Sequence, residues 1–335
     1  MKDQRFGCLG IGLVTLLVLS LLLNFAFLLV SSNSVRSAAL LPRQVPKFEE
    51  SLVVAGGGGV DDKIAVLSVR GLISTAAPGG LGESMVEDVK LQLKQAIEDS
   101  KVKAIVLQIE SPGGEVTSSD SIYHALARAR EKKPVVVSMG ALAASGGYYI
   151  ACGGSHLIAN ETTFTGSIGV IMQTINYEQL FGKVGLQMHT FKSGAFKDML
   201  SGSRPMTEEE KQYLQTLVMQ TYGKFVGIVA QERKLDEEQL RSGVADGRVV
   251  TGKDALSAKL IDQIGDVEAA YAKAMELGKA PGAAVIRYDA PFSLSRIFRI
   301  FTQSETKKIE VEIARALAPP LDPGKLYFLP GHYAP

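Results

Sequence analysis

The sequence is poor in several residue types that often carry a protein's chemistry. It has two cysteines, four histidines and no tryptophan among 335 residues. Cys8 and Cys152 lie far apart, the first inside a long apolar run, so no disulfide framework is predicted. No group of His, Cys and Asp has the spacing of metal ligands, and we expect neither a metal ion nor a cofactor.

The sequence also lacks an excess of charge of either sign. Its 36 Lys and Arg residues balance 35 Asp and Glu residues, which argues against a nucleic-acid-binding protein. Residues 247–253 fit the spacing of a phosphate-binding loop, but Asp254 stands where Ser or Thr would contact magnesium. A carboxylate there would repel phosphate, so ATP binding is not expected.

A long apolar run is present only near the amino terminus. Residues 7–30 contain no charged side chain, and about 24 helical residues would extend about 36 Å, enough to cross a bilayer. The apolar core of a cleavable signal peptide is shorter, so we expect an uncleaved anchor. Lys2 and Arg5 precede this run, which favours a cytoplasmic position for residues 1–6. We expect residues 31–60 to form a stalk.

The rest of the chain alternates strand and helix signals, which predicts one α/β domain over residues 61–290. Strands are predicted at 63–69, 105–109, 134–138, 156–159, 168–172, 187–191 and 284–288. Helices are predicted at 84–99, 177–184, 207–233, 251–258 and 266–277. A further helix is predicted to begin at a cap residue, Thr117 or Ser118. Thr207 and Glu210 have the spacing of a capping box.

The most informative residue is Ser145. It follows the strand signal at 134–138 through a run of small residues, and it precedes Gly146 and Gly147. A strand, a tight turn and a helix start in this order would expose a hydroxyl to solvent beside oriented helix N–H groups. Serine is also a common helix N-cap, so this stretch alone leaves both a nucleophile and a cap open.

A second glycine-rich strand end supports the nucleophile. The strand signal at 105–109 runs into Ser111-Pro112-Gly113-Gly114 and then into a helix. A strand that ends in this way can leave backbone N–H groups free in a cleft, as an oxyanion hole requires. An ordinary turn would have the same sequence, but two such ends in successive strand–helix units favour a site.

A serine nucleophile needs a base, and none of the four histidines lies in a triad-like motif. Lys192 and Lys197 flank a glycine turn, and a lysine can accept a proton only when its amine is neutral. Its pKa must then fall from about 10.4 to about 7–8, a change of roughly 4 kcal/mol that burial can supply. Phe196 and Met199 surround Lys197, which makes it the better candidate.

These motifs, taken in order, resemble those of a known family. They are Ser111-Pro-Gly-Gly114, Ala144-Ser-Gly-Gly-Tyr-Tyr149, Thr165-Gly-Ser-Ile-Gly-Val170, Lys192-Ser-Gly-Ala-Phe-Lys-Asp198, Ala245-Asp-Gly-Arg-Val249 and Leu260-Ile-Asp262. Over residues 63–280 the chain resembles the short form of the signal peptide peptidase A family, membrane-anchored serine proteases. The motifs are specific as a set, although each alone is weak.

The resemblance implies roles for individual residues. It implies a Ser/Lys dyad with Ser145 as the nucleophile and Lys197 as the base. It implies that the backbone N–H groups of Gly114 and Gly146 form the oxyanion hole, and it makes Ser167 a candidate for orienting the lysine amine. The dyad positions do not depart from the family pattern.

The resemblance also implies the fold of Clp protease and the crotonases, a spiral of ββα units after one transmembrane helix. Substrates would be signal peptide remnants and other unfolded or membrane-derived peptides. A homo-oligomer with grooves shared between protomers is implied, with a dyad that can join neighbouring chains. The catalytic domain of this single-pass membrane protein would lie outside the cytoplasm. The alanines near Ser145 predict small side chains beside the cleaved bond.

Two other functions remain open at this point. A crotonase-like acyl-CoA enzyme would share the fold and the oxyanion hole without needing Ser145 or a lysine. A catalytically inactive membrane scaffold is the second alternative, and the intact dyad positions argue against it. Cys152 is a weaker candidate nucleophile, because we expect it to be buried on the helix after Ser145.

The carboxyl-terminal residues 291–335 are the hardest part to interpret. The helical pattern over 291–302 fits a membrane surface, a neighbouring subunit or the protein core. Residues 326–329 are apolar, and we expect them to be extended. Our hypothesis is that this tail visits a protease groove, its own or a neighbour's.

Overall fold

The structure is a computed structural model, and it describes part of the chain. The described residues are 17, 18, 20–22, 24, 48–57, 61–75, 84–289 and 325–329. The chain divides into two compact units, Met1–Pro46 and Lys47–Pro335. Within the described residues, no helix combines the length and the apolar character needed to cross a membrane. Most of the expected anchor at 7–30, and all of residues 1–6, lie outside them.

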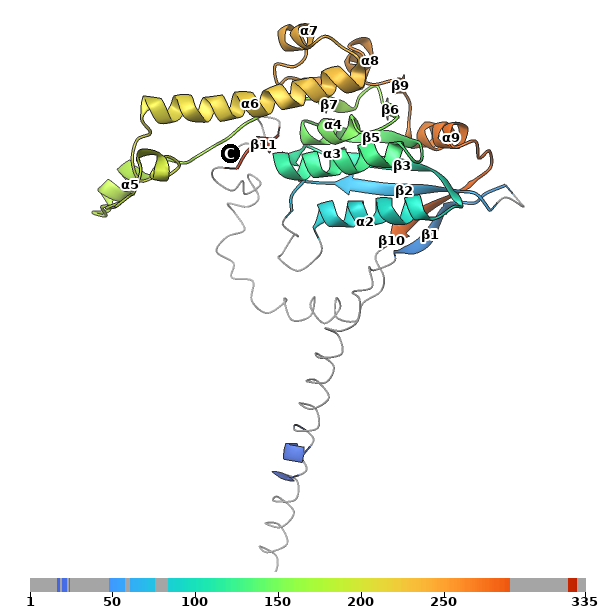
Figure 1. The fold of residues 1–335 in the computed structure, drawn as a ribbon, viewed down its shortest axis with the longest axis horizontal. Helices are drawn as coiled ribbons and strands as arrows, with labels where there is room; N and C mark the ends of the chain where they lie inside the picture. The colour runs from blue at the N-terminus through green and yellow to red at the C-terminus, as the bar shows by residue number, and fades with distance from the viewer. Residues whose placement is uncertain are drawn as a thin grey trace, which may run out of the picture. The chain divides into compact units, whose positions relative to one another are not determined.

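In the second unit, nine strands of the described chain form one sheet (Figure 1). They are β1 (Glu49–Val54), β2 (Lys63–Arg70), β3 (Val102–Ser111), β5 (Val135–Ala144), β6 (His156–Ala159), β7 (Phe164–Gly166), β8 (Val249–Thr251), β9 (Gln263–Ile264) and β10 (Ala284–Asp289). The spatial order is β1-β10-β2-β3-β5-β6-β9, and β7 joins β5 to β8. The pairs from β10 to β9 are parallel, whereas β1 is an antiparallel edge strand.

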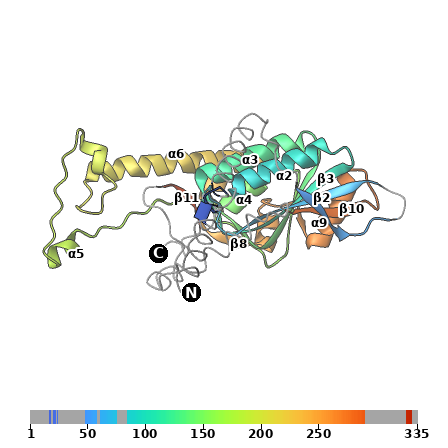
Figure 2. The same cartoon turned by 90° about the horizontal axis from the view of Figure 1, so that it is seen from below.

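Helices cover both faces of this sheet (Figure 2). They are α2 (Met85–Glu98), α3 (Val116–Arg130), α4 (Gly146–Ala151), α5 (Glu178–Lys183), α6 (Glu208–Arg233), α7 (Glu237–Ser242), α8 (Gly252–Ser257) and α9 (Val267–Leu277). Alternate residues of β2 point to opposite faces, as strand geometry requires. Leu67 joins the core under α2, α3 and α4, and Val66 joins a second core under α9.

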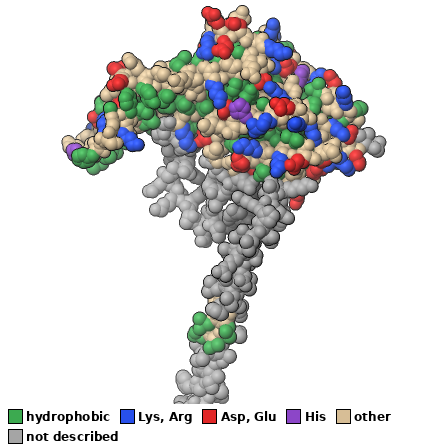
Figure 3. Space-filling model, in the orientation of Figure 1, with side chains coloured by type: hydrophobic (Ala, Val, Ile, Leu, Met, Phe, Trp, Pro, Cys, Tyr) green, Lys and Arg blue, Asp and Glu red, His purple; other side chains and the backbone are tan. Residues whose placement is uncertain are grey.

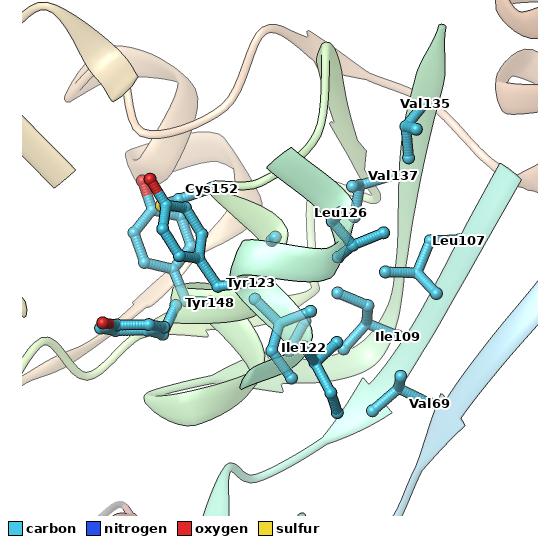
Figure 4. Close-up of a cluster of buried hydrophobic side chains, with 14 of the residues drawn as sticks. Val69, Leu107, Ile109, Ile122, Tyr123, Leu126, Val135, Val137, Tyr148 and Cys152 are labelled. Carbon is cyan, nitrogen blue, oxygen red and sulfur yellow. The ribbon is translucent and has the colours of Figure 1, made fainter. Parts of the chain in front are cut away.

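The larger core packs side chains of β3 and β5 against those of α3 and α4 (Figure 4). Strands β3 and β5 contribute branched side chains such as Leu107 and Val137, and α3 contributes Ile122 and Leu126, all of them fully buried. These residues form the buried face of α3. Because both strands end beneath the same helices, their carboxyl ends are held side by side.

Most of the predicted helices and strands are confirmed, including the capping box that starts α6 at Thr207. The predicted cap of α3 was wrong, because Glu115 is the N-cap residue and Ser118 instead donates to its carboxylate. The predicted strands at 168–172 and 187–191 were also wrong, since this part of the chain leaves the sheet. Among its described residues only Ile171 pairs, in a bridge to Tyr327.

Strand β1 changes the expected domain boundary. It lies within residues 31–60, for which we expected a stalk, but it pairs with β10 along its length. Phe48, just before it, is buried in the main core. The folded domain therefore begins before residue 61, and the remainder of the stalk prediction lies largely outside the described residues.

The sequence that fits the spacing of a phosphate-binding loop is a helix start. Thr251 is the N-cap of α8, and its hydroxyl accepts a hydrogen bond from Asp254 N at 3.2 Å. The same hydroxyl donates to the Asp254 carboxylate at 2.7 Å. The carboxylate thus completes a helix cap.

One segment projects from the body of the domain. Residues 171–206, here called the arm, connect β7 to α6 and contain α5 and the short 3-10 helix η2 (Ala195–Asp198). In both ribbon views the arm extends away from α4 (Figures 1 and 2). Figure 3 shows hydrophobic side chains gathered on its surface. Those with large exposed fractions are Ile175, Leu180, Val184, Leu186, Met188 and Phe191.

Candidate active site

Ser145 occupies a strained turn between β5 and α4. Its φ of 52° and ψ of −114° are unusual for a residue other than glycine. Ser145 N donates to Gly166 O at 2.8 Å, and Ser145 O accepts from Tyr149 N at 2.8 Å. The backbone is therefore held from both sides. The predicted sequence of strand, turn and helix is confirmed.

The Ser145 side chain is fully buried, and its hydroxyl oxygen has no hydrogen-bond partner within the described part of the chain. Ser145 is the N-cap residue of α4, as the alternative expected, but its side chain makes no capping hydrogen bond, so capping does not account for the hydroxyl. The expectation that the hydroxyl faces solvent was also wrong, because neighbouring segments cover the turn. A buried unpartnered hydroxyl costs about 1–3 kcal/mol, and such costs concentrate at functional sites.

Gly114 and Gly146 bring two backbone N–H groups beside this turn. A methyl group on Gly146 would lie 2.6 Å from Ser119 Oγ and 3.0 Å from Gly114 N. Only glycine fits there, and the two backbone segments are in direct contact. The structure thus joins the two glycine-rich strand ends that the sequence singled out, as an oxyanion hole requires.

A short strand from the carboxyl-terminal tail lies along the same glycines. Strand β11 (Tyr327–Phe328) pairs antiparallel with β4 (Gly114–Glu115), with Phe328 opposite Gly114. On the other edge, Tyr327 exchanges two backbone hydrogen bonds of 3.0 Å with Ile171. The tail of this chain is therefore held between two backbone segments, in agreement with the hypothesis that it visits a protease groove.

The carbonyl of Phe328 lies beside Gly113 and Gly114. A methyl group on Gly113 would lie 2.0 Å from Phe328 O and 2.7 Å from Gly146 N, so these atoms converge on one point. Gly113 has a φ of +113°, which a side chain would not tolerate. The ring of Phe328 is buried against those of Tyr149 and Phe225, with centroid distances of 4.8 and 4.7 Å.

This aromatic pocket does not agree with the expected preference for small side chains. The alanines that motivated it belong to β5, where Ala143 pairs with Ser111 and Ala144 pairs with Gly166. Their small size serves the close approach of three strands. The groove beside the glycines holds a phenylalanine side chain instead.

Lys197 lies in η2 of the arm, and its side chain is exposed. Since Ser145 Oγ has no partner in the described residues, the two side chains are not bonded within one chain. The apolar surroundings expected for this lysine are also absent in the single chain. The ring of Phe196 contacts that of Tyr213, with 5.4 Å between the two centroids.

Lys192 is committed to an ion-pair network in the arm. Its ammonium lies 2.6 Å from Asp198, which also binds Arg204 at 2.6 Å, and Arg204 bridges onward to Glu210. Hydrogen bonds from Arg204 and Lys192 hold the pKa of Asp198 well below its ordinary range. Because this ion pair and a bond to Ala195 O occupy the Lys192 ammonium, Lys197 is the better candidate of the two for a base.

Ser167 lies next to the Ser145 turn. It directly follows Gly166, whose carbonyl accepts the hydrogen bond from Ser145 N. It is buried, has a φ of 50°, and donates from its backbone N to Arg248 O at 2.8 Å. The structure therefore groups Ser145, Gly114, Gly146 and Ser167, and it leaves Lys197 outside the group.

Cys152 lies at the end of α4 next to Tyr148, within the core (Figure 4). Burial raises the pKa of its thiol to about 12, so the reactive thiolate is not formed near neutral pH. The expectation that it is buried is confirmed. Of the histidines that the structure describes, His124 lies near Asp120, His156 contacts Gln263 and His189 is exposed.

Sequence reasoning missed Glu115, the buried carboxylate directly after Gly114. An acid that follows a Gly-Gly pair was a signal, but its partner Lys325 lies far along the chain. Reasoning from the sequence also missed the aromatic pair Tyr149 and Phe225, which only the packing of α4 against α6 brings together.

Comparisons with known proteins identify a family for the chain. A family model described as Peptidase family S49 matches residues 127–280, and one described as Clp protease matches 71–163. A proposed protease of Synechocystis sp. is 42% identical over 206 residues, which cover 62% of this chain and 71% of that protein. A proposed signal peptide peptidase SppA of Enterococcus faecium is 38% identical over 235 residues, covering 69% and 68%. The chloroplastic serine protease SPPA of Arabidopsis thaliana is 32% identical over 234 residues, covering 70% and 33%.

The fold, the strained serine turn and these matches define a serine protease with an α/β, Clp protease-like architecture. Within that class, the chain belongs to peptidase family S49 and is similar to signal peptide peptidase A. The family resemblance seen in the sequence is confirmed. A protease is thereby favoured over the acyl-CoA enzyme and over the inactive scaffold.

Proposed function

We propose that this protease is a membrane-anchored endopeptidase that uses Ser145 and Lys197 as a catalytic dyad. One observation carries the proposal. The Ser145 hydroxyl is buried and unpartnered on a strained turn, beside two glycine N–H groups at which a peptide carbonyl already lies. A nucleophile and an oxyanion hole need this arrangement.

The reaction is an acyl transfer. The neutral amine of Lys197 takes the proton from Ser145 Oγ, which attacks the peptide carbonyl. The N–H groups of Gly114 and Gly146 donate to the oxyanion that forms. Lys197 then gives its proton to the leaving amine, and water hydrolyses the ester on Ser145. Ser167, beside the turn, is our candidate for orienting the lysine amine.

A second copy of the chain completes the site in this proposal. The exposed position of Lys197 supports it, because a lysine that acts as a base needs apolar surroundings, which the described part of one chain does not give it. The arm presents exposed apolar side chains such as Phe191, which is 98% exposed, and packing against another subunit would cover them. Desolvation in that interface would lower the pKa of the lysine, as its role as a base requires. The protein is then a homo-oligomer with shared grooves.

The mode of peptide binding follows from the tail strand. A substrate in the position of β11 adds a strand between Gly114–Glu115 and Ile171. The residue in the place of Phe328 then precedes the cleaved bond, and the pocket of Tyr149 and Phe225 favours a large apolar side chain there. Only an extended chain can bind in this way, which favours unfolded or membrane-derived peptides, including signal peptide remnants.

The uncharged run at residues 7–30 supports a single-pass anchor in the cell membrane. We propose that residues 1–6 lie in the cytoplasm and the catalytic domain outside it. Protease treatment of spheroplasts tests this orientation, since an external domain is degraded without lysis. Protection of the domain in intact spheroplasts would contradict it.

Labelling with a fluorophosphonate probe tests the nucleophile. The full-length protein should become labelled and should cleave an unfolded protein such as casein, and Ser145→Ala should lose both activities. Ser100→Ala, at an exposed turn, is the matched control and should keep both. Labelling that persists in Ser145→Ala would place the nucleophile elsewhere.

A further inference from the structure

The carboxylate of Glu115 lies in the wall of the peptide groove, one residue after Gly114. Only 7% of its side chain is exposed. Thr75 donates to it from its backbone N at 3.1 Å and from its hydroxyl at 3.2 Å, and Ser118 donates its hydroxyl at 2.8 Å. The body of the domain therefore fixes this carboxylate with three neutral donors.

The remaining contact of Glu115 comes from the tail. Lys325 Nζ donates to Glu115 Oε1 at 2.8 Å, and Lys325 is the only charged partner that the described residues give this carboxylate. Burial by itself would raise the pKa of Glu115, but the bonds from Lys325, Thr75 and Ser118 outweigh it and lower the pKa to about 2. With Lys325 in place the group is thus an anion at any physiological pH, and a buried anion favours a cation beside it.

The register of the tail strand fixes where that cation lies in a bound peptide. Tyr327 is opposite Glu115 and Phe328 is opposite Gly114. Lys325 is two residues from Tyr327, so its side chain lies on the same face and reaches Glu115 along the diagonal of the strand pair. Lys325 is consequently three residues before Phe328, whose carbonyl lies at the oxyanion glycines.

We propose that Glu115 determines substrate specificity by selecting a lysine or arginine three residues before the residue whose peptide bond is cleaved. The inference rests on the proposed function, in which the tail occupies the position of a substrate. A neutral side chain at that place would leave the carboxylate without its cation beneath the bound peptide. An acidic side chain would be repelled by it.

Three fluorogenic peptides built on residues 325–330 test the proposal, with Lys, Gln or Glu in the place of Lys325. They are compared in competition, on the full-length protein, with the cleavage site read by mass spectrometry. Competition by the protein's own tail cancels in the ratio of kcat/KM values. We expect Lys over Gln by about 10-fold and Lys over Glu by about 100-fold, as charge-assisted hydrogen bonds predict.

Glu115→Gln should reduce the preference for Lys over Gln to less than about 2-fold, and Glu115→Lys should reverse the preference between Lys and Glu. The matched control is Glu131→Gln at the opposite end of α3, which should keep the wild-type ratios. If Glu115 only stabilises the start of α3, its replacement lowers all rates together and leaves the ratios unchanged, which overturns the proposal. If the variants fail to fold, the wild-type ratios still test the proposal, because equal kcat/KM values for the Lys, Gln and Glu peptides would overturn it.

Failure of this proposal is distinguishable from failure of the proposed function. Binding of the three peptides to full-length Ser145→Ala is measured by fluorescence anisotropy, which needs no turnover. A preference for Lys in binding, without cleavage by the wild type, supports the subsite and contradicts the peptidase mechanism. Cleavage without preference overturns the subsite alone, and neither cleavage nor preferential binding overturns both.

Discussion

The two members of the proposed dyad lie in regions with opposite physical character. Ser145 is fully buried, and its backbone is held by bonds to Gly166 and Tyr149. Lys197 is exposed in an arm whose apolar side chains have no cover within the described part of one chain. The first region is set by the packing of a single domain. The second exposes apolar side chains that another subunit could cover.

This difference separates stability from activity. A change near Ser145 disturbs packed backbone, so it should affect both the free energy of unfolding and turnover. A change in the arm should affect turnover through the position of Lys197 and leave the unfolding of the domain nearly unchanged. The domain would then fold before its active site is complete, and assembly would switch the protease on.

The largest expected effect comes from dividing the dyad between subunits. Ser145→Ala and Lys197→Ala should each reduce turnover by about 10⁴-fold or more, because removal of either member removes the activated nucleophile. Co-expression of the two variants with different tags should restore activity, since mixed particles contain sites with Ser145 from one chain and Lys197 from its neighbour. Peptide hydrolysis by doubly purified particles measures the recovery.

The control for this experiment is the double variant Ser145→Ala/Lys197→Ala, which should restore nothing when it is co-expressed with either single variant. If the tags show that subunits mix and activity still does not return, the dyad forms within one chain. In that case the arm of one chain would already complete the site at Ser145, and no second subunit would be needed.

A pair of Gly→Ala substitutions compares the two regions directly. In Gly146→Ala the new methyl group would meet Ser119 Oγ at 2.6 Å, so we expect a loss of about 1–3 kcal/mol in the free energy of unfolding. Displacing this oxyanion N–H should also lower kcat by about 10²–10³-fold. Gly194 in the arm has no atom within 4 Å of the same methyl position, and Gly194→Ala should change stability by less than about 0.5 kcal/mol.

Urea denaturation and peptide hydrolysis measure both effects. Equal destabilisation by the two substitutions would mean that the arm packs as tightly as the Ser145 turn. That result would remove the physical distinction on which the proposed assembly mechanism depends.

The same distinction explains what the sequence could predict. The α/β architecture and the turn at Ser145 follow from local signals, because the strand end carries its own glycines. The pairing of Gly114 with Gly146 was implied by the family resemblance, and the structure brings the two residues together. The predicted strands at 168–172 and 187–191 fail for a complementary reason. These residues lie in the arm or lead directly into it, where the described part of the chain offers almost no strand partner.

Contacts between distant segments were beyond prediction. The sequence around Glu115 does not indicate that Lys325 lies beside it, and an apolar tail does not reveal its register against Gly114. Solvent exposure of Ser145 was predicted wrongly because the turn was considered alone. Burial depends on which other segments cover a residue, and local sequence carries little information about them.

A smaller effect is expected from the ion pairs that anchor the base of the arm. Arg204 binds Asp198 and Glu210, and its bond lowers the pKa of Glu210 to about 2. Because this folded-state pKa lies below the ordinary value of 4.5, the contact is complete above about pH 4.5 and is lost as the pH falls towards 2. The pKa of Asp198 is lowered as well, which has the same sign.

Since the chain has no tryptophan, Phe196→Trp would place a single fluorophore next to Lys197. Its emission should stay constant from pH 7 to about pH 5 and change below that range. Adding Arg204→Ala should produce the altered emission already at pH 7. Emission that does not respond to Arg204→Ala would show that another contact positions this end of the arm.

The smallest effect is expected at Cys152, a cysteine at the end of the helix that begins after Ser145. Its thiol is fully enclosed and has a pKa of about 12, so almost none of it is thiolate at neutral pH. Cys152→Ala should leave kcat/KM and fluorophosphonate labelling within about 2-fold and lower the free energy of unfolding by about 1 kcal/mol, the cost of a small cavity. A loss of activity without a loss of stability would mean that the thiol takes part in the reaction. The packed half of the site would then hold a nucleophile that needs no lysine from the arm, and the need for a second subunit would disappear with it.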